Sequence, residues 1–138
     1  MDPIYELSGM LRARLRADTA VAGLVGNRVY ERPPDTGQAV SPYISIGSWS
    51  SADDSADCID TQEVSVQIDC WSFGGSDDEG AVKKIAGAVR KSLNDVEFNL
   101  TNNALATINH RITRYQRESD AVTARAIVTV TAVVEAAS

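Results

Sequence analysis

The feature that most constrains the fold is a strict alternation of apolar and polar residues from residue 62 onwards. Between residues 62 and 71, one side of the chain carries Val64, Val66, Ile68 and Cys70, and the other carries Glu63, Ser65, Gln67 and Asp69. A period of two residues predicts a strand with one buried face. Residues 121–135 alternate strongly and residues 105–116 more loosely. The polar residues 117–120 between them therefore predict a long antiparallel hairpin.

Two helices are expected where apolar residues recur every three or four positions. The first begins at Asp2-Pro3, an N-cap acid followed by proline, and its apolar stripe holds Ile4, Leu7, Leu11 and Leu15. The second spans residues 78–93, and its stripe holds Val82, Ile85, Ala86, Val89 and Leu93. Ser76 is the expected N-cap of this second helix, with Glu79 completing a capping box.

The other segments are short. Residues 18–26 are expected to form the end of the first helix and a turn between its glycines, residues 29–30 a short extended piece, and residues 43–49 a strand. The expected order is α-β-β-β-α-β-β in a single domain, residues 1–138. Strands grouped by hairpins, with two helices on one face, predict an α+β fold with a mostly antiparallel sheet of about four to five strands.

The charge of the chain argues against several classes of protein. Lys and Arg number 13 and Asp and Glu 19, which gives a net charge of −6, whereas dedicated nucleic-acid-binding domains usually carry a basic excess. No apolar run approaches the roughly 18 residues that a membrane span requires. The N-terminus also lacks a cationic segment followed by an apolar core, so we expect no signal peptide and no membrane partner.

Residues of the types used in catalysis do not form a recognisable motif. Gly75 and Gly80 have the glycine spacing of a phosphate-binding loop, but residues 81–82 are Ala and Val instead of Lys and Ser or Thr, and residues 77–79 are acidic. His110 has no nucleophile brought to it by a local motif. The aspartates at 53, 54, 57 and 60 lack the spacing of an EF-hand loop, so a solvated acidic loop is expected. We therefore expect no enzyme activity, no cofactor and no metal.

The two cysteines are too few for a disulfide scaffold. Cys58 and Cys70 also lack the spacing of a Cys-x-x-Cys motif. We expect two reduced thiols, with Cys70 in the core, and a disulfide between them is the alternative.

Three sets of residues are candidates for contact with another protein. The aromatic pair Trp71 and Phe73 follows the end of a strand. The basic set lies on the C-terminal hairpin, where Arg111 and Arg125 are expected on facing strands, and the acidic set lies in the loop before residue 60. The basic set is Arg111, Arg114, Arg117 and Arg125, and the acidic set is Asp53, Asp54 and Asp57. Either the basic surface of one subunit meets the acidic loop of the next in a head-to-tail ring, or the two surfaces are unrelated and solvated.

The order of several short motifs resembles the phage tail completion (tail terminator) family of long-tailed phages and gene-transfer particles. After the first helix the family has a segment L-x-x-L-x-G-x-R-I/V-Y, to which this chain is similar at Val21, Leu24, Gly26, Arg28, Val29 and Tyr30. The next family segment, P-Y-x-x-I/L-G, is matched by Pro42, Tyr43, Ile46 and Gly47, and Trp71-Ser72 stands at the expected strand end. The aspartate-rich loop and the residues after Leu93 depart from this pattern.

The resemblance implies a structural virion protein. Such a subunit would form a ring, typically a hexamer, at the head-proximal end of a siphovirus-type tail. It would stop tail-tube polymerisation and join the tube to the head connector, with DNA only passing through the lumen. Its partners would be itself, the tail tube protein and the connector, and it would assemble in the host cytoplasm. A small non-enzymatic binding or regulatory module, which uses the sheet face or the segment from Trp71 to Phe73, is the alternative.

Overall fold

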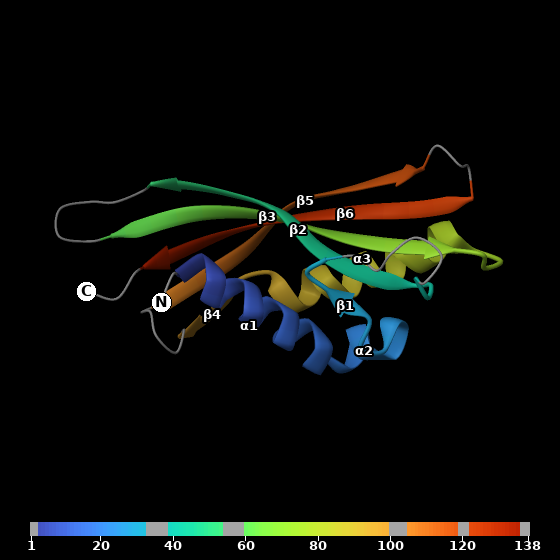
Figure 1. The fold of residues 1–138 in the computed structure, drawn as a ribbon, viewed down its shortest axis with the longest axis horizontal. Helices are drawn as coiled ribbons and strands as arrows, with labels where there is room; N and C mark the ends of the chain where they lie inside the picture. Colours follow the sequence, from blue (N-terminus) through green and yellow to red (C-terminus); the bar gives the residue numbers. More distant parts are fainter. Residues whose placement is uncertain (1–2, 33–38, 54–59, 100–104, 119–121, 136–138) are drawn as a thin grey trace.

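Four long strands form the centre of one sheet (Figure 1). The computed structural model describes residues 3–32, 39–53, 60–99, 105–118 and 122–135. Within these residues the sheet has six strands in the order β1-β2-β3-β6-β5-β4. The long strands are β2 (Tyr43–Asp53), β3 (Thr61–Phe73), β5 (Leu105–Arg117) and β6 (Thr123–Glu135), and the short ones are β1 (Val29–Tyr30) and β4 (Val96–Asn99). Neighbouring strands are antiparallel except for β1 and β2, which are parallel.

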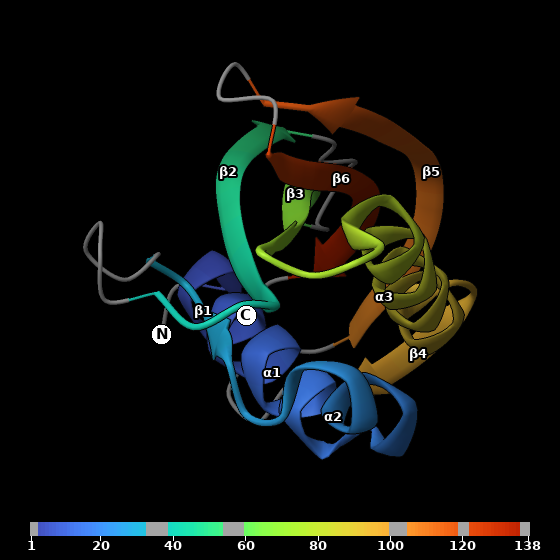
Figure 2. The same ribbon diagram turned by 90° about the vertical axis from the view of Figure 1, so that its right-hand side faces the viewer.

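The helices lie on one face of this sheet (Figures 1 and 2). They are α1 (Pro3–Ala17), α2 (Thr19–Val25) and α3 (Asp78–Leu93). Helix α3 packs on β3, β5 and β6, and α1 packs against α2, α3, β1 and β6. We call the face that carries the helices the inner face and the opposite one the outer face. The α+β class and the mostly antiparallel sheet are therefore confirmed.

The core lies between the inner face and the helices. The apolar residues of β3 that alternate in the sequence, Val64, Val66, Ile68 and Cys70, are no more than 1% exposed. They share one apolar cluster with the leucines of α1 and the stripe of α3, which are Leu7, Leu11, Leu15, Val82, Ile85, Val89 and Leu93. The alternation and the helical stripe therefore identified the buried side of these elements correctly.

The segment after α1 is a second helix, and the prediction of a turn there was wrong. Asp18 ends the connection from α1 and caps α2, because its carboxylate accepts hydrogen bonds from the backbone N–H groups of Ala20 (2.9 Å) and Val21 (3.1 Å). Val21 and Val25 lie one helical turn apart and are both buried. Gly26, not Gly23, ends the helix, and its positive φ of 62° suits glycine.

Two further differences concern the strands. Strand β4 was not predicted; its four residues pair with residues 105–108 of β5. Strand β2 does not end at Trp49 but continues to Asp53, past a bulge between Ile46 and Trp49. It continues because β3 offers a partner as far as Gln62, which pairs with Asp53. Asp53 therefore belongs to a strand and not to the predicted acidic loop, and Asp54 and Asp57 lie outside the described residues.

A charge on the inner face should unfold the domain. Ile85 of α3 and Val66 of β3 are each 1% exposed. An unpaired buried carboxylate costs several kcal/mol, which is comparable with the roughly 5–15 kcal/mol that stabilises a domain. We expect Ile85→Asp and Val66→Asp to abolish the cooperative transition in a thermal melt followed by circular dichroism. Lys84→Asp, at the exposed neighbouring position, is the control and should melt cooperatively. A cooperative melt in either core variant would contradict the assignment of the inner face.

Candidate interaction surface

The connection from β3 to α3 is fixed by its own carboxylates. Asp77, not Ser76 as predicted, is the N-cap of α3, and its carboxylate accepts a hydrogen bond from the backbone N–H of Gly80 at 3.0 Å. A Cβ atom at position 80 would lie 2.1 Å from the Asp77 carboxylate, so only glycine allows this close approach. Because Asp77 occupies the position three residues before Gly80, the expected capping box of Ser76 and Glu79 does not form.

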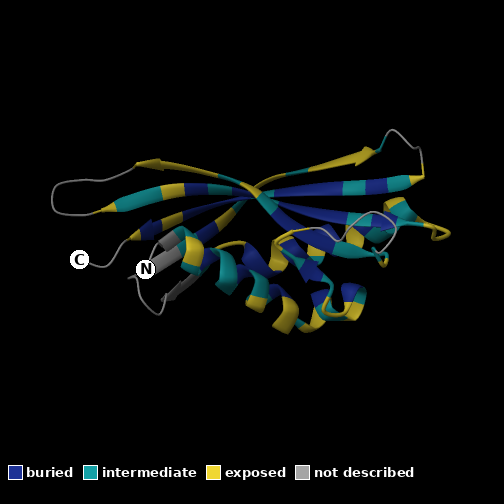
Figure 3. Ribbon diagram, viewed as in Figure 1, coloured by how far each residue is buried: buried dark blue, intermediate teal, exposed yellow. Residues whose placement is uncertain are grey.

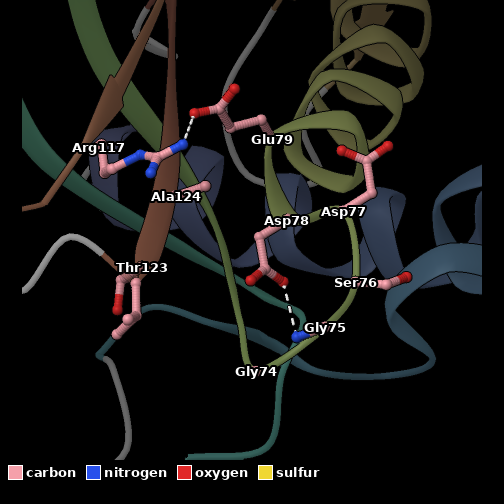
Figure 4. A pocket seen from close by; sticks show the side chains of 10 residues that line it. Gly74, Gly75, Ser76, Asp77, Asp78, Glu79, Arg117, Thr123 and Ala124 are labelled. Atoms are coloured by element: carbon pink, nitrogen blue, oxygen red, sulfur yellow. Dashed lines mark hydrogen bonds and ion pairs between the residues drawn. The ribbon is translucent and has the colours of Figure 1, made fainter.

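A cavity of about 450 Å³ adjoins this turn (Figure 4). Asp78 closes the turn by accepting hydrogen bonds from the Ser72 hydroxyl (2.7 Å) and the Gly75 N–H (3.1 Å). On the opposite wall, Arg117 of β5 forms an ion pair with Glu79 of α3. The cavity is lined by more carboxylates than cations, and the guanidinium is already paired, so an anionic ligand such as phosphate is disfavoured here.

Trp71 lies at one end of the outer face within a group of aromatic and polar side chains. Its indole Nε1–H donates to the Ser45 hydroxyl at 3.0 Å, and its ring stacks against Tyr43 with centroids 6.2 Å apart. The Arg125 guanidinium lies 4.6 Å from the centroid of the Trp71 ring, within the range of a cation–π contact. Trp71 is half-buried, so part of its ring stays open to a partner on the face that no described helix covers.

A buried ion pair lies next to this group. Arg125 of β6 bonds to the Asp69 carboxylate of β3 at 3.1 Å and lies 3.7 Å from Glu118. Asp69 is only 8% exposed, and this burial raises the pKa of its carboxyl group, an effect that the bond to Arg125 opposes. Asp69 Oδ1 and Arg125 Nε are buried and have no hydrogen-bond partner among the described residues. The described residues thus leave two polar atoms of the pair without a hydrogen bond.

The sequence did not predict that Asp69 is the partner of Arg125. Asp69 was visible only as a polar residue two positions before Trp71. The pairing depends on the register between β3 and β6, in which Trp71 stands opposite Arg125 and Asp69 opposite Ile127. Alternation gives the face of a strand but not its register, so no local signal identified the pair.

The four predicted arginines do not form one cluster. Arg111 and Arg125 do lie on facing strands, β5 and β6, as expected, but Arg125 stands opposite Gln116 and not opposite Arg111. Arg111 occupies the bulge between His110 and Ile112, which shifts the register and removes it from the ladder. Arg111 and Arg114 are exposed, and neither has an ion pair with a described residue, whereas Arg117 and Arg125 are paired with acids of this chain.

The remaining interface candidates are only partly described. Phe73 is half-buried at the end of β3, where its backbone N–H donates to the Ser41 hydroxyl at 2.9 Å. Asp53 is exposed at the end of β2. Cys58, like Asp54 and Asp57, lies outside the described residues, and Cys70 is a free, buried thiol whose pKa is raised by burial.

His110 is a partly buried residue of β5. Its Nε2 lies 2.7 Å from the Thr113 hydroxyl, and its backbone N–H donates to the Asn94 side chain at 3.0 Å. Burial and the nearby charge of Arg90 lower the pKa of the imidazole. Both of these His110 groups therefore have hydrogen-bond partners within the chain.

Two further site types were searched for in the described part of the chain. There, no group of three or more His, Cys, Asp or Glu residues is arranged to hold a metal ion. Nor does a described helix combine the length and apolarity needed to cross a bilayer.

Comparison with known proteins gives the family. Residues 9–135 match the family described as "Tail completion protein gp17". This chain belongs to that family. A chain in a solved structure described as "Virion of native gene transfer agent (GTA) particle" is similar in fold, with a TM-score of 0.79 and 26% sequence identity. The match covers 91% of each chain. No curated protein sequence matches the chain.

Membership of the tail completion family makes this chain a structural tail protein and a component of a virion, as the sequence predicted. The surfaces described above are candidates for contacts in assembly. The outer face carries Trp71, Tyr43 and Arg125, and β5 carries the exposed Arg111 and Arg114.

The buried pair should make the stability depend on pH. We expect Arg125→Met to lower the free energy of unfolding by about 2 kcal/mol at pH 7. This is less than the loss of about 3–5 kcal/mol expected for a fully buried pair, because the Arg125 side chain is 22% exposed. A carboxyl group whose pKa is raised on folding stabilises most when protonated, and this contribution is lost as pH rises through the folded pKa. Without Arg125 the raised pKa of Asp69 rises further. The difference in unfolding free energy between the natural chain and the Arg125→Met variant should therefore become smaller towards about pH 4.

Urea unfolding at both pH values measures this effect. In an Asp69→Asn background, Arg125→Met should show much less narrowing, because only the weaker 3.7 Å contact with Glu118 remains to titrate. An equal deficit for Arg125→Met at both pH values would show that Asp69 is not the charge that Arg125 compensates.

Proposed function

We propose that this protein is a ring-forming tail terminator. In this proposal, copies of the chain assemble on the head-proximal end of the tail tube, stop its polymerisation and join it to the head connector. The observation that carries the proposal is the match to a tail completion family over residues 9–135. The similarity to a chain of a gene transfer agent virion over 91% of both chains supports it.

A ring that caps a tube needs two kinds of surface, one for its neighbouring subunits and one for the tube or connector. The exposed Arg111 and Arg114 on β5, and the acids around the β2–β3 connection, are suited to the contacts between subunits. We include Asp53, Asp54, Asp57, Arg117 and Arg125 in this set, although Arg117 and Arg125 are also paired within the chain. The charges of the two sets are opposite, which favours a head-to-tail arrangement over two identical surfaces in contact.

The C-terminal end of β3 is suited to a different partner. Trp71 and Phe73 are half-buried aromatic residues next to Gly74, which has a positive φ of 75°. Aromatic residues and arginine are enriched among residues that dominate binding energy in interfaces. We assign these two residues to the contact with the tube or the connector.

The proposal includes no catalytic step and no cofactor. DNA would only pass through the lumen of the ring, for which the net charge of −6 is suitable because an acidic surface does not retain phosphate groups. The number of subunits expected from the resemblance is six, a value that assembly experiments must measure.

Assembly in the presence of tail tube protein tests the proposal. Negative-stain electron microscopy should show rings at one end of the tubes, and the tubes should stop growing when the protein is added. Sedimentation velocity should show a complex larger than a monomer with tube protein present. Tubes that keep growing with no density added at either end, together with a monomer in both conditions, would refute the proposal and favour a small binding module.

A further inference from the structure

We propose that neighbouring subunits join by pairing the free edge of β2 in one copy with the free edge of β5 in the next. The β2 free edge is defined as residues 49–52 and the β5 free edge as residues 112–116. The inference deepens the proposed function, because it names the contact between the subunits of the proposed ring. The partner at each free edge is a second copy of this chain.

Both edges are open because the outermost strands of the sheet are short. Strand β1 pairs with β2 only at Ile44 and Ser45, and β4 pairs with β5 only at residues 105–108. Over residues 49–52 of β2 and 112–116 of β5, the described strands pair on one side only. An unpaired edge presents a row of backbone donors and acceptors that an added strand can satisfy.

The exposure of β5 supports this reading of its edge. Ile112 is 50% exposed and Tyr115 is 51% exposed, although both are large and apolar. They point to opposite faces of the strand, as their partners Thr129 and Ala126 do. Exposed residues lie at the far ends of β2 and β5, on opposite sides of the molecule (Figure 3). A strand added at the β5 free edge would cover apolar area on both faces.

Each free edge begins just after a bulge. In β2 the register shifts between Ile46 and Trp49, and in β5 it shifts between His110 and Ile112. Bulges and charged side chains are two devices by which proteins keep open edges from pairing indiscriminately. Such devices leave pairing open to a partner of matching shape and charge.

The charges decide which edges can pair. The β5 free edge carries Arg114 and is preceded by Arg111, both exposed, whereas the end of β2 lies beside the exposed acids Asp53, Asp60 and Glu63. Two β5 edges, or two β2 edges, would place like charges opposite each other, which is destabilising. Only the pairing of β2 with β5 brings opposite charges together. Because this contact joins two different surfaces, it generates a ring or a filament instead of a closed dimer.

The directions of the strands permit this pairing. Strands β2 and β5 run antiparallel to each other across the sheet (Figure 1), so β5 of one copy is antiparallel to β2 of a neighbour placed beside it. The two free edges lie at opposite ends of the sheet, so the neighbour must be displaced along the strands. Within one copy, Ser51 of β2 pairs with Val64 of β3, Val64 pairs with Ala132 of β6, and Ala132 pairs with Ile108 of β5. Ser51 and Ile108 therefore lie at the same level along the strands.

The displacement is compatible with a closed ring. The centre of the β5 free edge is six residues beyond position 108, which is about 20 Å at a rise of roughly 3.3 Å per residue. The four long strands are together about 19 Å wide at a spacing of about 4.8 Å. A stagger of this size inclines the strands by about 45°, close to the range of roughly 35–45° found in closed barrels.

A charge exchange between the two edges tests the pairing. We expect Arg111→Glu with Arg114→Glu to abolish ring assembly on tail tubes, as seen by electron microscopy at low salt. Adding Asp53→Lys and Glu63→Lys to the same chain should restore it, because the opposite charges are then present with exchanged positions. Lys83→Glu with Lys84→Glu makes the same change of net charge on the exposed side of α3 and should leave assembly intact.

The outcomes separate this inference from the proposed function. If the natural chain forms rings and the Arg111→Glu and Arg114→Glu chain forms them equally well, the β2–β5 contact is wrong and the terminator proposal stands. If the natural chain forms no rings with tube protein, the terminator proposal fails first. Loss of assembly in both the arginine and the lysine variants would show that only the overall charge matters, which also overturns the β2–β5 contact.

Amide hydrogen exchange tests whether backbone groups are involved. In assembled rings, outward-facing amides in residues 112–116 should exchange on the order of tenfold more slowly, or slower still, than in the isolated chain. The amides of the buried stretch of β3, which are paired on both sides in either state, provide the control. Unchanged exchange in residues 112–116 on assembly would overturn strand pairing, even if the charge variants behaved as expected.

Discussion

The burial of one face of β3 and β6 against the helices is the interaction on which the rest of the structure depends. These two strands are neighbours along their whole length, and their inner residues, from Val64 to Cys70 and from Ala124 to Val134, are almost completely inaccessible to water. The apolar stripes of α1 and α3 provide the area that covers them. Because the three helices of the described residues lie on the inner face, no described helix covers the outer face. The strand residues that point to the outer face are mostly polar. The same burial that stabilises the fold thus leaves a broad surface of the sheet for contacts with other proteins.

The outer face is not uniform. At one end, Asp69, Arg125 and Trp71 form a group in which a buried carboxylate, a guanidinium and an aromatic ring restrain one another. A buried ion pair adds little net stability, since the loss of hydration offsets most of the attraction between the charges. Such a pair does fix the positions of its members. The side chains that surround Trp71 are therefore held in place, and in the proposed contact with a partner this order lowers the entropy lost on binding.

The edges of the sheet are the second feature with consequences for assembly. Natural sheets usually cover, shorten or charge their edges, and here β1 and β4 cover only part of β2 and β5. Each open part follows a bulge, and the two parts differ in charge, with acidic residues beside the β2 edge and arginines on the β5 edge. In the ring proposed above for this structural tail protein, an edge that accepts one partner and excludes others serves assembly.

The sequence alone determined the elements whose patterns are long: the alternation of β3 and of the β5–β6 hairpin, and the stripes of α1 and α3. The bounds of α3 were predicted to the residue because its apolar stripe is a local signal, although its N-cap is Asp77 and not the predicted Ser76. Helix α2 and strand β4 are too short to show a clear period, so they were missed. Strand register, and hence the pairing of Asp69 with Arg125 and the separation of Arg111 from Arg125, was decided by the tertiary structure. Register depends on bulges and on partner strands distant in sequence, whereas alternation within one strand reports only which side is buried.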